Sequence, residues 1–443
     1  MKRKILNDLM KWKEKTQKKP LIIKGARQVG KTYIIREFAQ KAYEDLVEIN
    51  FERDLEFVEL FKKTHNPQEI LQYLEVSFMD KTFDQNTLFF MDEIQACSDA
   101  LTSLKFLAES FPCDIICSGS MLGVAIANST SFPVGYVETW QMYPLSFMEF
   151  VEALGMNEKI IKNLNECLLK GQPIMETLHD KMNDLFKDYM IVGGMPEVVS
   201  EYIETKSFKE TLLVQRRIVS DYLNDMVKYA DGSERIKVRE CYQSIPLQLA
   251  KENKKFQYKL VKSGGNARYY DASLNWLKDS GLINLTYRLK TIDKPLEIHK
   301  ESAVFKVYMA DTGLLVSQFD ESVIKELLSG ELGIFKGALY ENMAAQILGM
   351  HERVLYYFQP NTNAEIDFII YYKGEICPLE IKAGRNTVSK SFTNFVEKYK
   401  SAYAFRLSQK NIGMSKENVN YIPLYMLEML LNQEKESYYE GVK

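Results

Sequence analysis

A glycine-containing segment near the N-terminus constrains the fold more than any other feature of this chain. Residues 21–32 read LIIKGARQVGKT: a short apolar run, Gly25, four further residues, and then Gly30, Lys31 and Thr32. The next residues, YIIREFA, have the apolar spacing of a helix. Glycines permit the backbone angles that turn successive N–H groups toward phosphate oxygens, and a helix N-terminus adds partial positive charge. The pattern predicts a strand, a phosphate-binding loop and a helix.

This order of elements is typical of P-loop NTPases. We expect Lys31 to reach the β and γ phosphates of ATP and the Thr32 hydroxyl to ligate Mg²⁺. The competing interpretation is an ordinary glycine turn. If the loop binds ATP, its contacts come from Gly25, Ala26, Arg27, Gln28, Val29, Gly30, Lys31 and Thr32.

A second segment is expected to supply the other side of the metal site. Residues 87–93, TLFFMDE, form an apolar run that ends in two carboxylates. This pattern favours a buried parallel strand whose C-terminal end lies in the ligand crevice. Asp92 would hold Mg²⁺ through its water shell, and Glu93 would polarise the attacking water as the catalytic base. The two carboxylates therefore favour ATP hydrolysis over binding alone.

Further apolar runs complete the expected sheet. Residues 114–118 read DIICS and continue into Gly119 and Ser120. Ser118 and Ser120 are candidate sensors of the γ-phosphate, with a polar strand end as the alternative. Residues 47–51 and 137–142 bring the number of expected strands to about five, with helices between them. We therefore expect an α/β fold with a doubly wound parallel sheet.

Five segments in this order resemble the AAA-like predicted ATPases of bacteria and archaea, which join a P-loop domain to a long domain of uncharacterised function. They are GARQVGKT, FFMDEIQ, IICSGS, YPLSFMEF (143–150) and YMIVGGMPEVV (189–199). The resemblance implies a winged helix and a nuclease-like tail. One departure concerns Tyr136, because that family often has a basic residue before its PLSF motif. No arginine finger is assigned there, and Arg216 and Arg217 are fallback candidates that also suit surface or salt-bridge roles.

The middle of the chain, residues 201–300, has a helical pattern followed by the outline of a winged helix. A helix around Arg268, Tyr269 and Tyr270 would enter a DNA groove, with lysines on the phosphates. The alternative is a packing module with solvated lysines, because four residues, Tyr269, Leu274, Trp276 and Leu277, are expected in a core. The lysines in question are Lys251, Lys254, Lys255, Lys259 and Lys262.

The last third carries a pattern of charged residues that resembles the PD-(D/E)xK superfamily of nucleases. Glu341 lies in a helical segment, Asp367 in an expected strand, and Glu380 and Lys382 follow in an expected second strand. Residues two apart on a strand point to the same face. Glu341, Asp367 and Glu380 are thus candidate Mg²⁺ ligands, and Lys382 is the candidate group that orients or deprotonates the attacking water. The proline of the superfamily motif is missing here.

Composition limits the other possibilities. The net charge is −3, so the chain as a whole has no positive field that attracts nucleic acid. Its six cysteines are scattered and no stretch is apolar enough for a signal peptide or a membrane span, which favours a cytoplasmic protein. We expect an AAA-like P-loop ATPase domain with a helical lid over residues 1–200, a helical and winged-helix region over 201–300, and a restriction-endonuclease-like α/β domain over 301–443.

Three functional hypotheses remain open. The first is an ATP-driven switch, with Mg²⁺ as cofactor, that remodels a protein or nucleic-acid partner. The second is a DNA nuclease gated by ATP. The third is a non-catalytic, DNA-binding or toxin-type adaptor whose ATP site regulates assembly. Homo-oligomerisation is compatible with each of them.

Overall fold

The structure is a computed structural model that describes residues 1–120, 123, 132–229, 232, 234–251, 254–329, 334–361, 364–384, 389–415 and 419–440. It divides into an N-terminal unit, Met1–Leu145 with Asp279–Gly281, and a C-terminal unit, Ser146–Lys278 with Leu282–Lys443. No described helix combines the length and the apolar character that crossing a membrane requires.

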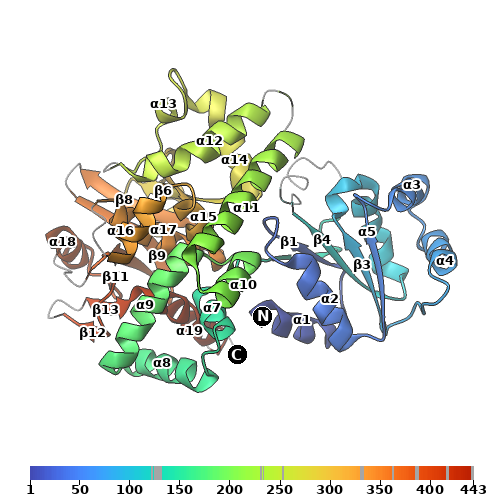
Figure 1. The fold of residues 1–443 in the computed structure, drawn as a ribbon, viewed down its shortest axis with the longest axis horizontal. Helices are drawn as coiled ribbons and strands as arrows, with labels where there is room; N and C mark the ends of the chain where they lie inside the picture. Colours follow the sequence, from blue (N-terminus) through green and yellow to red (C-terminus); the bar gives the residue numbers. More distant parts are fainter. Residues whose placement is uncertain are drawn as a thin grey trace. The chain divides into compact units, whose positions relative to one another are not determined.

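A five-stranded parallel sheet forms the centre of the N-terminal unit (Figure 1). All four neighbouring pairs run parallel, which confirms the predicted sheet. Its central strands are buried on both faces, which explains their nearly continuous apolar sequence. The strand order is β2 (Asp45–Asn50), β3 (Thr87–Asp92), β4 (Asp114–Gly119), β1 (Leu21–Lys24) and β5 (Glu138–Gln141).

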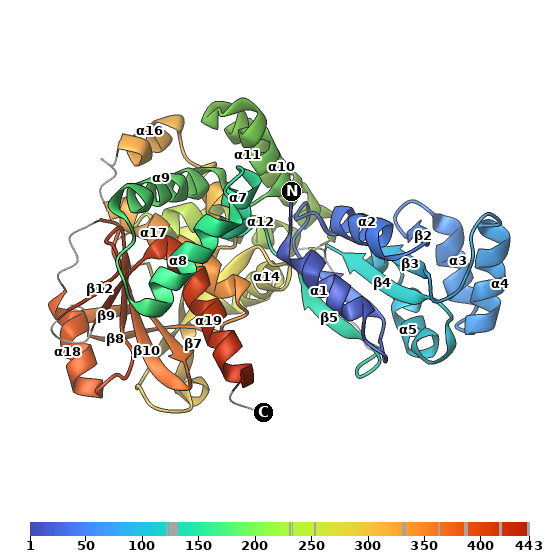
Figure 2. The ribbon, with the colours of Figure 1, turned by 90° about the horizontal axis from the view of Figure 1, so that it is seen from below.

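Helices cover both faces of this sheet, as Figure 2 shows for α2 and α5 on opposite sides of β4. Trp12 and Phe38 pack edge to face and join two helices on one side of the sheet, α1 (Lys4–Lys13) and α2 (Lys31–Ala42). The other side carries a single apolar core with three helices. These are α3 (Leu55–Lys63), α4 (Pro67–Ser77) and α5 (Ser98–Ser110).

The C-terminal unit begins with helices. The Ser146 side chain accepts the N–H of Glu149, and the Glu149 carboxylate accepts the N–H of Ser146, so the PLSF segment starts a helix with a capping box. The helices are α7 (Phe147–Ala153), α8 (Glu158–Lys170), α9 (Glu176–Val192), α10 (Pro196–Thr205), α11 (Phe208–Tyr229), α12 (Glu234–Leu249), α13 (Tyr258–Val261) and α14 (Ala267–Asp279).

The GGMP segment closes the turn between α9 and α10 against a later part of the chain. Buried Asp311 accepts the N–H of Gly194 at 2.7 Å and that of Leu314 at 2.9 Å. A Cβ on Gly193 would lie 2.2 Å from Asp311 Oδ1, and one on Gly313 would lie 2.5 Å from the Gly193 nitrogen. The glycines of this segment are therefore required by close packing, and the segment holds α15 (Thr312–Val316) against α9.

A mixed eight-stranded sheet organises the rest of this unit. The hairpin of β9 and β10 turns at Lys373 and Gly374, both in the left-handed region, and β10 then pairs in parallel with β11. The strand order is β12 (Gly413–Met414), β13 (Asn420–Pro423), β11 (Phe405–Ser408), β10 (Glu375–Ile381), β9 (Ala364–Tyr372), β8 (Leu355–Asn361), β6 (Ile283–Leu289) and β7 (Lys300–Met309).

Two helices lie on opposite faces of this sheet (Figure 2). One is α17 (Ile334–Met350), whose residues are apolar on nearly every side, as in a helix surrounded by protein. The other is α18 (Lys390–Tyr399), which presents Phe392, Phe395 and Val396 to β8 and β9. The remaining helices are α16 (Glu321–Ser329) and α19 (Leu427–Glu440). Of the predicted charged residues, Glu341 lies in α17 and Asp367 of β9 is near it, whereas Glu380 pairs with Arg406, which lies over the Phe392 ring of α18.

Candidate functional site

The predicted loop joins β1 to α2 as its sequence requires. A Cβ on Gly25 would lie 2.2 Å from the backbone oxygen of Met142, so this position has no room for a side chain. Gly30 has a φ of 93° and leads directly into Lys31, the first residue of α2. Gln28 also lies in the left-handed region, with a φ of 64°. The loop therefore has the tight backbone path that glycines permit, and one strained non-glycine position.

Lys31 is buried in this loop. Its ammonium donates to the backbone oxygens of Gly25 at 3.0 Å and Ala26 at 2.9 Å. Burial lowers the pKa of Lys31 to about 8, although the nearby carboxylates of Glu93 and Asp92 oppose that change. The ammonium thus lies inside the loop and close to both carboxylates at the end of β3.

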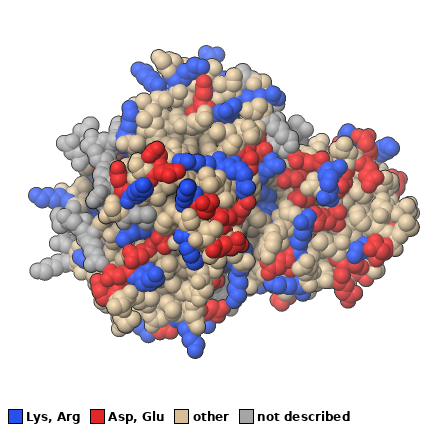
Figure 3. Space-filling view, viewed as in Figure 1, with Lys and Arg blue, Asp and Glu red and all other residues tan. Residues whose placement is uncertain are grey.

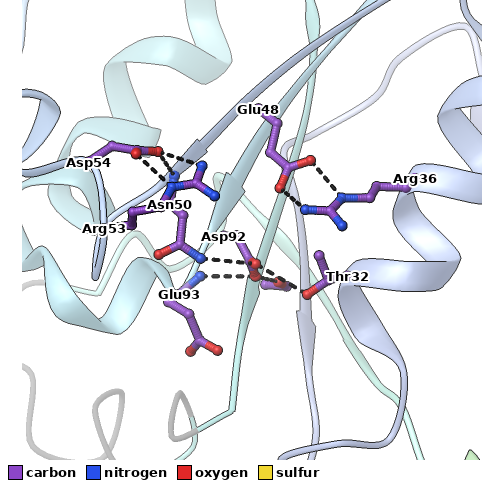
Figure 4. A network of polar contacts seen from close by, with 9 residues as sticks. Thr32, Arg36, Glu48, Asn50, Arg53, Asp54, Asp92 and Glu93 are labelled. Atoms are coloured by element: carbon purple, nitrogen blue, oxygen red, sulfur yellow. Dashed lines mark hydrogen bonds and ion pairs between the residues drawn. The ribbon is translucent and has the colours of Figure 1, made fainter.

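Asp92 is the centre of a hydrogen-bond network built from four chain segments (Figure 4). Its carboxylate accepts the Thr32 hydroxyl at 3.1 Å, the Asn50 amide at 3.2 Å and the Ser118 hydroxyl. The N–H of Glu93 donates to the same group at 3.1 Å. Burial raises the pKa of Asp92, and these donors counteract the rise. The structure therefore places the side chains of Thr32 and Asp92 within hydrogen-bond distance of each other.

Glu93 adopts a left-handed backbone conformation directly after β3, with a φ of 50°. Gln95 donates its side-chain N–H to the Glu93 carboxylate at 2.5 Å, and the Ser120 hydroxyl donates to it at 3.3 Å. Ser118 and Ser120, which the sequence offers as phosphate sensors, thus contact Asp92 and Glu93 respectively in this structure.

Asn50 and Gln95 are the residues of this site that the sequence does not single out. Asn50 ends β2, and its proximity to Asp92 follows only from the pairing of β2 with β3. Its backbone N–H is held by Asp54 at 2.9 Å, and Asp54 pairs with Arg53 (Figure 4). The usable signal was a polar residue at the end of an apolar strand, which becomes informative once the strand order is known.

The fallback arginines have partners within the C-terminal unit. Arg216 donates to the backbone oxygens of Ser317 and Phe319, both at 3.3 Å. Arg217 forms an ion pair with Glu197. These contacts are the salt-bridge and surface roles that the sequence left open for both residues.

The charged residues predicted in the tail fall into two groups, the first of which contains Glu341 of α17 and Asp367 of β9. Buried Glu341 accepts the Tyr308 hydroxyl at 2.9 Å and forms ion pairs with Lys254 and with Lys306, the latter at 3.7 Å. Lys306 is buried too and pairs with Glu365 at 2.5 Å. These cations keep Glu341 charged, since they lower its pKa against the effect of burial.

Asp367 lies at an irregularity in β9. Tyr356 of β8 pairs with Ile369, whereas Phe358 pairs with Ile366, so β9 has one extra residue in this interval. Such a bulge re-aims side chains and recurs beside active sites. The Asp367 carboxylate accepts the Ile381 N–H at 2.8 Å, and burial, with Glu341 nearby, raises the pKa of Asp367 to about 7.

Glu380 and Lys382 follow on β10 and just beyond it. The buried Glu380 carboxylate pairs with Arg406 of β11 at 2.7 Å and with Lys382 at 3.0 Å. Lys382 keeps about a third of its side chain exposed. Each predicted ligand except Asp367 thus has a cation as its direct partner.

Taken together, the two groups of the tail contain as many basic as acidic side chains. Within the described part of the chain, no three His, Cys, Asp or Glu residues form a group that could hold a metal ion. Ammonium and guanidinium groups pair with the carboxylates of Glu341, Glu365 and Glu380, and no described contact joins Glu380 to Asp367 or Glu341. We call the two groups together the carboxylate–cation cluster. The first group comprises Glu341, Glu365, Asp367, Lys254 and Lys306, and the second, in which Arg406 lies over the Phe392 ring of α18, comprises Glu380, Lys382 and Arg406.

Comparison with protein families divides the chain into three matched segments. Residues 17–151 match a family described as an AAA domain. Residues 183–323 and 336–427 match two families described as domains of unknown function (DUF8612 and DUF4143). With the parallel sheet and the loop geometry, the first match defines the class: the N-terminal part of the chain is a P-loop ATPase-like domain of the AAA type.

Individual relatives are more distant. An uncharacterized protein of Haemophilus influenzae is 29% identical over 199 residues, which cover 43% of this chain and 42% of that protein. The Walker-type ATPase paby2304 of Pyrococcus abyssi is 17% identical with a TM-score of 0.44, covering 72% of this chain and 95% of its own. The Orc1 protein of Aeropyrum pernix, solved in complex with DNA, is 10% identical with a TM-score of 0.29, covering 74% and 91% respectively.

Proposed function

We propose that this protein binds ATP with Mg²⁺ and hydrolyses it, acting as a nucleotide-driven switch. The observation that carries the proposal is the meeting of Lys31, Thr32, Asp92 and Glu93 at the C-terminal edge of a parallel sheet. Two separate segments of sequence, each predicted independently, supply these groups: the loop gives the cation and the hydroxyl, and the end of β3 gives the carboxylates that phosphoryl transfer requires.

The oxygen atoms of this site suit Mg²⁺, which prefers hard oxygen ligands. The Thr32 hydroxyl and an Asp92 carboxylate oxygen are 3.1 Å apart and come from the loop and from β3. When bound, Mg²⁺ neutralises charge on the phosphates. Lys31 would leave the loop carbonyls for the β and γ phosphates, and Glu93 would accept a proton from the attacking water.

The test is Mg²⁺-dependent ATP turnover by the full chain, measured beside ATP binding. We expect phosphate release that requires Mg²⁺ and stops with EDTA. Binding of ATP without turnover would favour the adaptor hypothesis, and the absence of binding would reject the nucleotide site. Repeating the assay with duplex DNA and looking for nicked product in the same sample separates the switch from the nuclease.

We propose a nucleic acid as the first candidate partner of the switch. Residues 234–301 contain 14 Lys and Arg against 8 Asp and Glu, a local excess of positive charge in a chain of net charge −3. In Figure 3, basic side chains gather over the part of the C-terminal unit that contains α12 and α13. Tyr270, Leu274 and Leu277 of α14 are buried, whereas Arg268 and Tyr269 are exposed. Salt-dependent binding of duplex DNA would support this partner.

DNA cleavage by the C-terminal unit is the second candidate function. The observation in its favour is the bulge that re-aims Asp367 beside Glu341, with Glu380 and Lys382 on the neighbouring strand. The four cations of the carboxylate–cation cluster argue for a structural role instead. Cleavage with Mn²⁺ that Asp367→Asn abolishes would establish the nuclease, and no cleavage of any DNA form would leave the cluster as a packing element.

A further inference from the structure

Gln95 contacts the proposed catalytic base without having a role in the predicted mechanism. It lies in the short 3-10 helix η1 (Ile94–Ala96), two residues after Glu93. Its Nε2 donates to Glu93 Oε2 at 2.5 Å, a short hydrogen bond to a charged acceptor. Its Oε1 is buried and has no hydrogen-bond partner among the described residues.

A buried Oε1 without a donor lowers the stability of the folded chain, which is unexpected for a residue that only stabilises the fold. A buried oxygen without a donor forfeits the hydrogen bonds that water gives it in the unfolded chain. A methionine of similar size would fill the same space without that cost. The Gln95 amide is therefore better explained by its Nε2 atom, which donates to the Glu93 carboxylate and fixes its orientation.

We propose that Gln95 is a positioning residue for Glu93, an inference that rests on the proposed ATPase function. Glu93 follows β3 in a left-handed conformation, so its backbone alone does not aim the carboxylate. Gln95 and Ser120 hold the same oxygen, Oε2, from two segments of chain. The other oxygen, Oε1, remains to take the proton of the attacking water. A carboxylate fixed in this way needs less reorganisation when the reaction begins.

The experiment compares Gln95→Met with the parental protein and with Gln72→Met, the same substitution at an exposed position of α4. We expect Gln95→Met to melt at or above the parental temperature, because the buried oxygen is gone. ATP affinity should change by less than about 2-fold, since the described hydrogen bond of Gln95 goes to Glu93 and not to the loop. Turnover should fall by about 10-fold or more while KM stays constant, which is the loss of an interaction made in the transition state.

A second readout does not depend on turnover. ADP with fluoroaluminate imitates the transferring phosphoryl group with its in-line water, so its affinity relative to ADP reports the arrangement of Glu93. Gln95→Met should reduce that ratio, and Gln72→Met should leave it unchanged.

The outcomes distinguish this inference from the proposed function. A parental protein that binds ATP yet neither hydrolyses it nor captures ADP–fluoroaluminate overturns the proposed hydrolysis together with the role of Gln95. A parental protein that does both, with a Gln95→Met variant that matches it in turnover and in capture, overturns the role of Gln95 alone. A variant that loses turnover together with melting temperature and ATP affinity overturns it too, because those losses indicate a structural residue.

Discussion

The two acidic sites of this protein differ in the kind of group that satisfies their carboxylates. Asp92 of the N-terminal unit accepts hydrogen bonds from neutral donors, the hydroxyls of Thr32 and Ser118 and the amide of Asn50. Glu341 of the C-terminal unit accepts the neutral Tyr308 hydroxyl as well, but two lysines, Lys254 and Lys306, also form ion pairs with it. Neutral donors orient a carboxylate and leave its charge available to a cation, whereas ammonium groups compensate that charge within the chain.

The difference indicates why similar residue types do not define similar sites. Three carboxylates and a lysine in the tail match a nuclease pattern, yet Lys254, Lys306 and Arg406 supply the positive charge that a divalent metal would bring. Near Asp92 the one buried cation, Lys31, is held by loop carbonyls instead of by an ion pair. The carboxylate of Asp92 therefore has no ion-pair partner in the described contacts, whereas Glu341 and Glu380 are each paired with cations.

The largest expected effect concerns Lys31. Lys31→Ala removes the positive charge from the loop, so turnover should fall by about 10³-fold or more and ATP affinity should weaken. Phosphate release and ATP binding measure these effects. The control is Lys41→Ala in the same helix, where Lys41 forms an exposed pair with Glu37. If a folded Lys31→Ala protein bound and hydrolysed ATP as the parental protein does, the N-terminal site would not be the proposed nucleotide site.

The next effect tests the ion-paired carboxylates of the C-terminal unit. Lys306→Met removes a buried cation and leaves Glu341 and Glu365 without it, which should lower the free energy of unfolding by about 3–5 kcal/mol. Urea denaturation of the full chain measures the loss. Lys294→Met, which removes an exposed lysine paired with Glu375, should cost less than about 1 kcal/mol. If both substitutions cost the same, the cluster is not compensated in the way proposed.

How much the sequence predicts depends on how local the determinants are. The loop, its strand and its helix are contiguous, and the five strands appear as apolar runs, so the sheet and the positions of Lys31 and Thr32 follow from spacing. The roles of Asn50 and Gln95 do not. Asn50 reaches Asp92 only because β2 pairs with β3, and Gln95 reaches Glu93 only because the chain turns at a left-handed residue.

In the C-terminal tail, even fewer of the contacts between charged residues can be predicted from the sequence. Its hairpin, with Lys373 and Gly374 at the turn, follows from the sequence. The partners of its carboxylates come from three other elements: Lys254 lies before α13, Lys306 in β7 and Arg406 in β11. Charge compensation over such separations is a property of the folded structure and has no local sequence pattern.

A third prediction uses the one carboxylate of the cluster that lacks a direct cation. Unfolded Asp367 has a pKa of about 3.9, and the folded pKa is about 7, because Asp367 is buried beside Glu341 and Glu365, with Lys306 opposing the rise. Between these values the folded state binds more protons, so stability falls as the pH rises from about 4 to 7. The penalty is absent below this window, complete above it, and at most about 4 kcal/mol.

Asp367→Asn should remove this pH dependence. The variant should gain stability over the parental chain at pH 8 and show no gain at pH 4, because its amide oxygen still accepts the Ile381 N–H. Denaturation at several pH values measures the difference, and Asp184→Asn at an exposed site should give parallel curves. A parental stability that does not change across this window would show that another group compensates Asp367.

The smallest effect separates binding from chemistry at the first site. Glu93→Gln keeps the size of the side chain and removes its charge, so ATP should bind with near-parental affinity while turnover falls by about 10²-fold, or about 2.7 kcal/mol in the barrier. Glu75→Gln, at an exposed position of α4, is the matched control. Because Asp92 retains its hydroxyl and amide donors in this variant, Mg²⁺-dependent ATP binding should persist. Turnover at the parental rate would mean that the carboxylate of Glu93 does not accept the proton, and that neutral donors around Asp92 serve nucleotide binding alone.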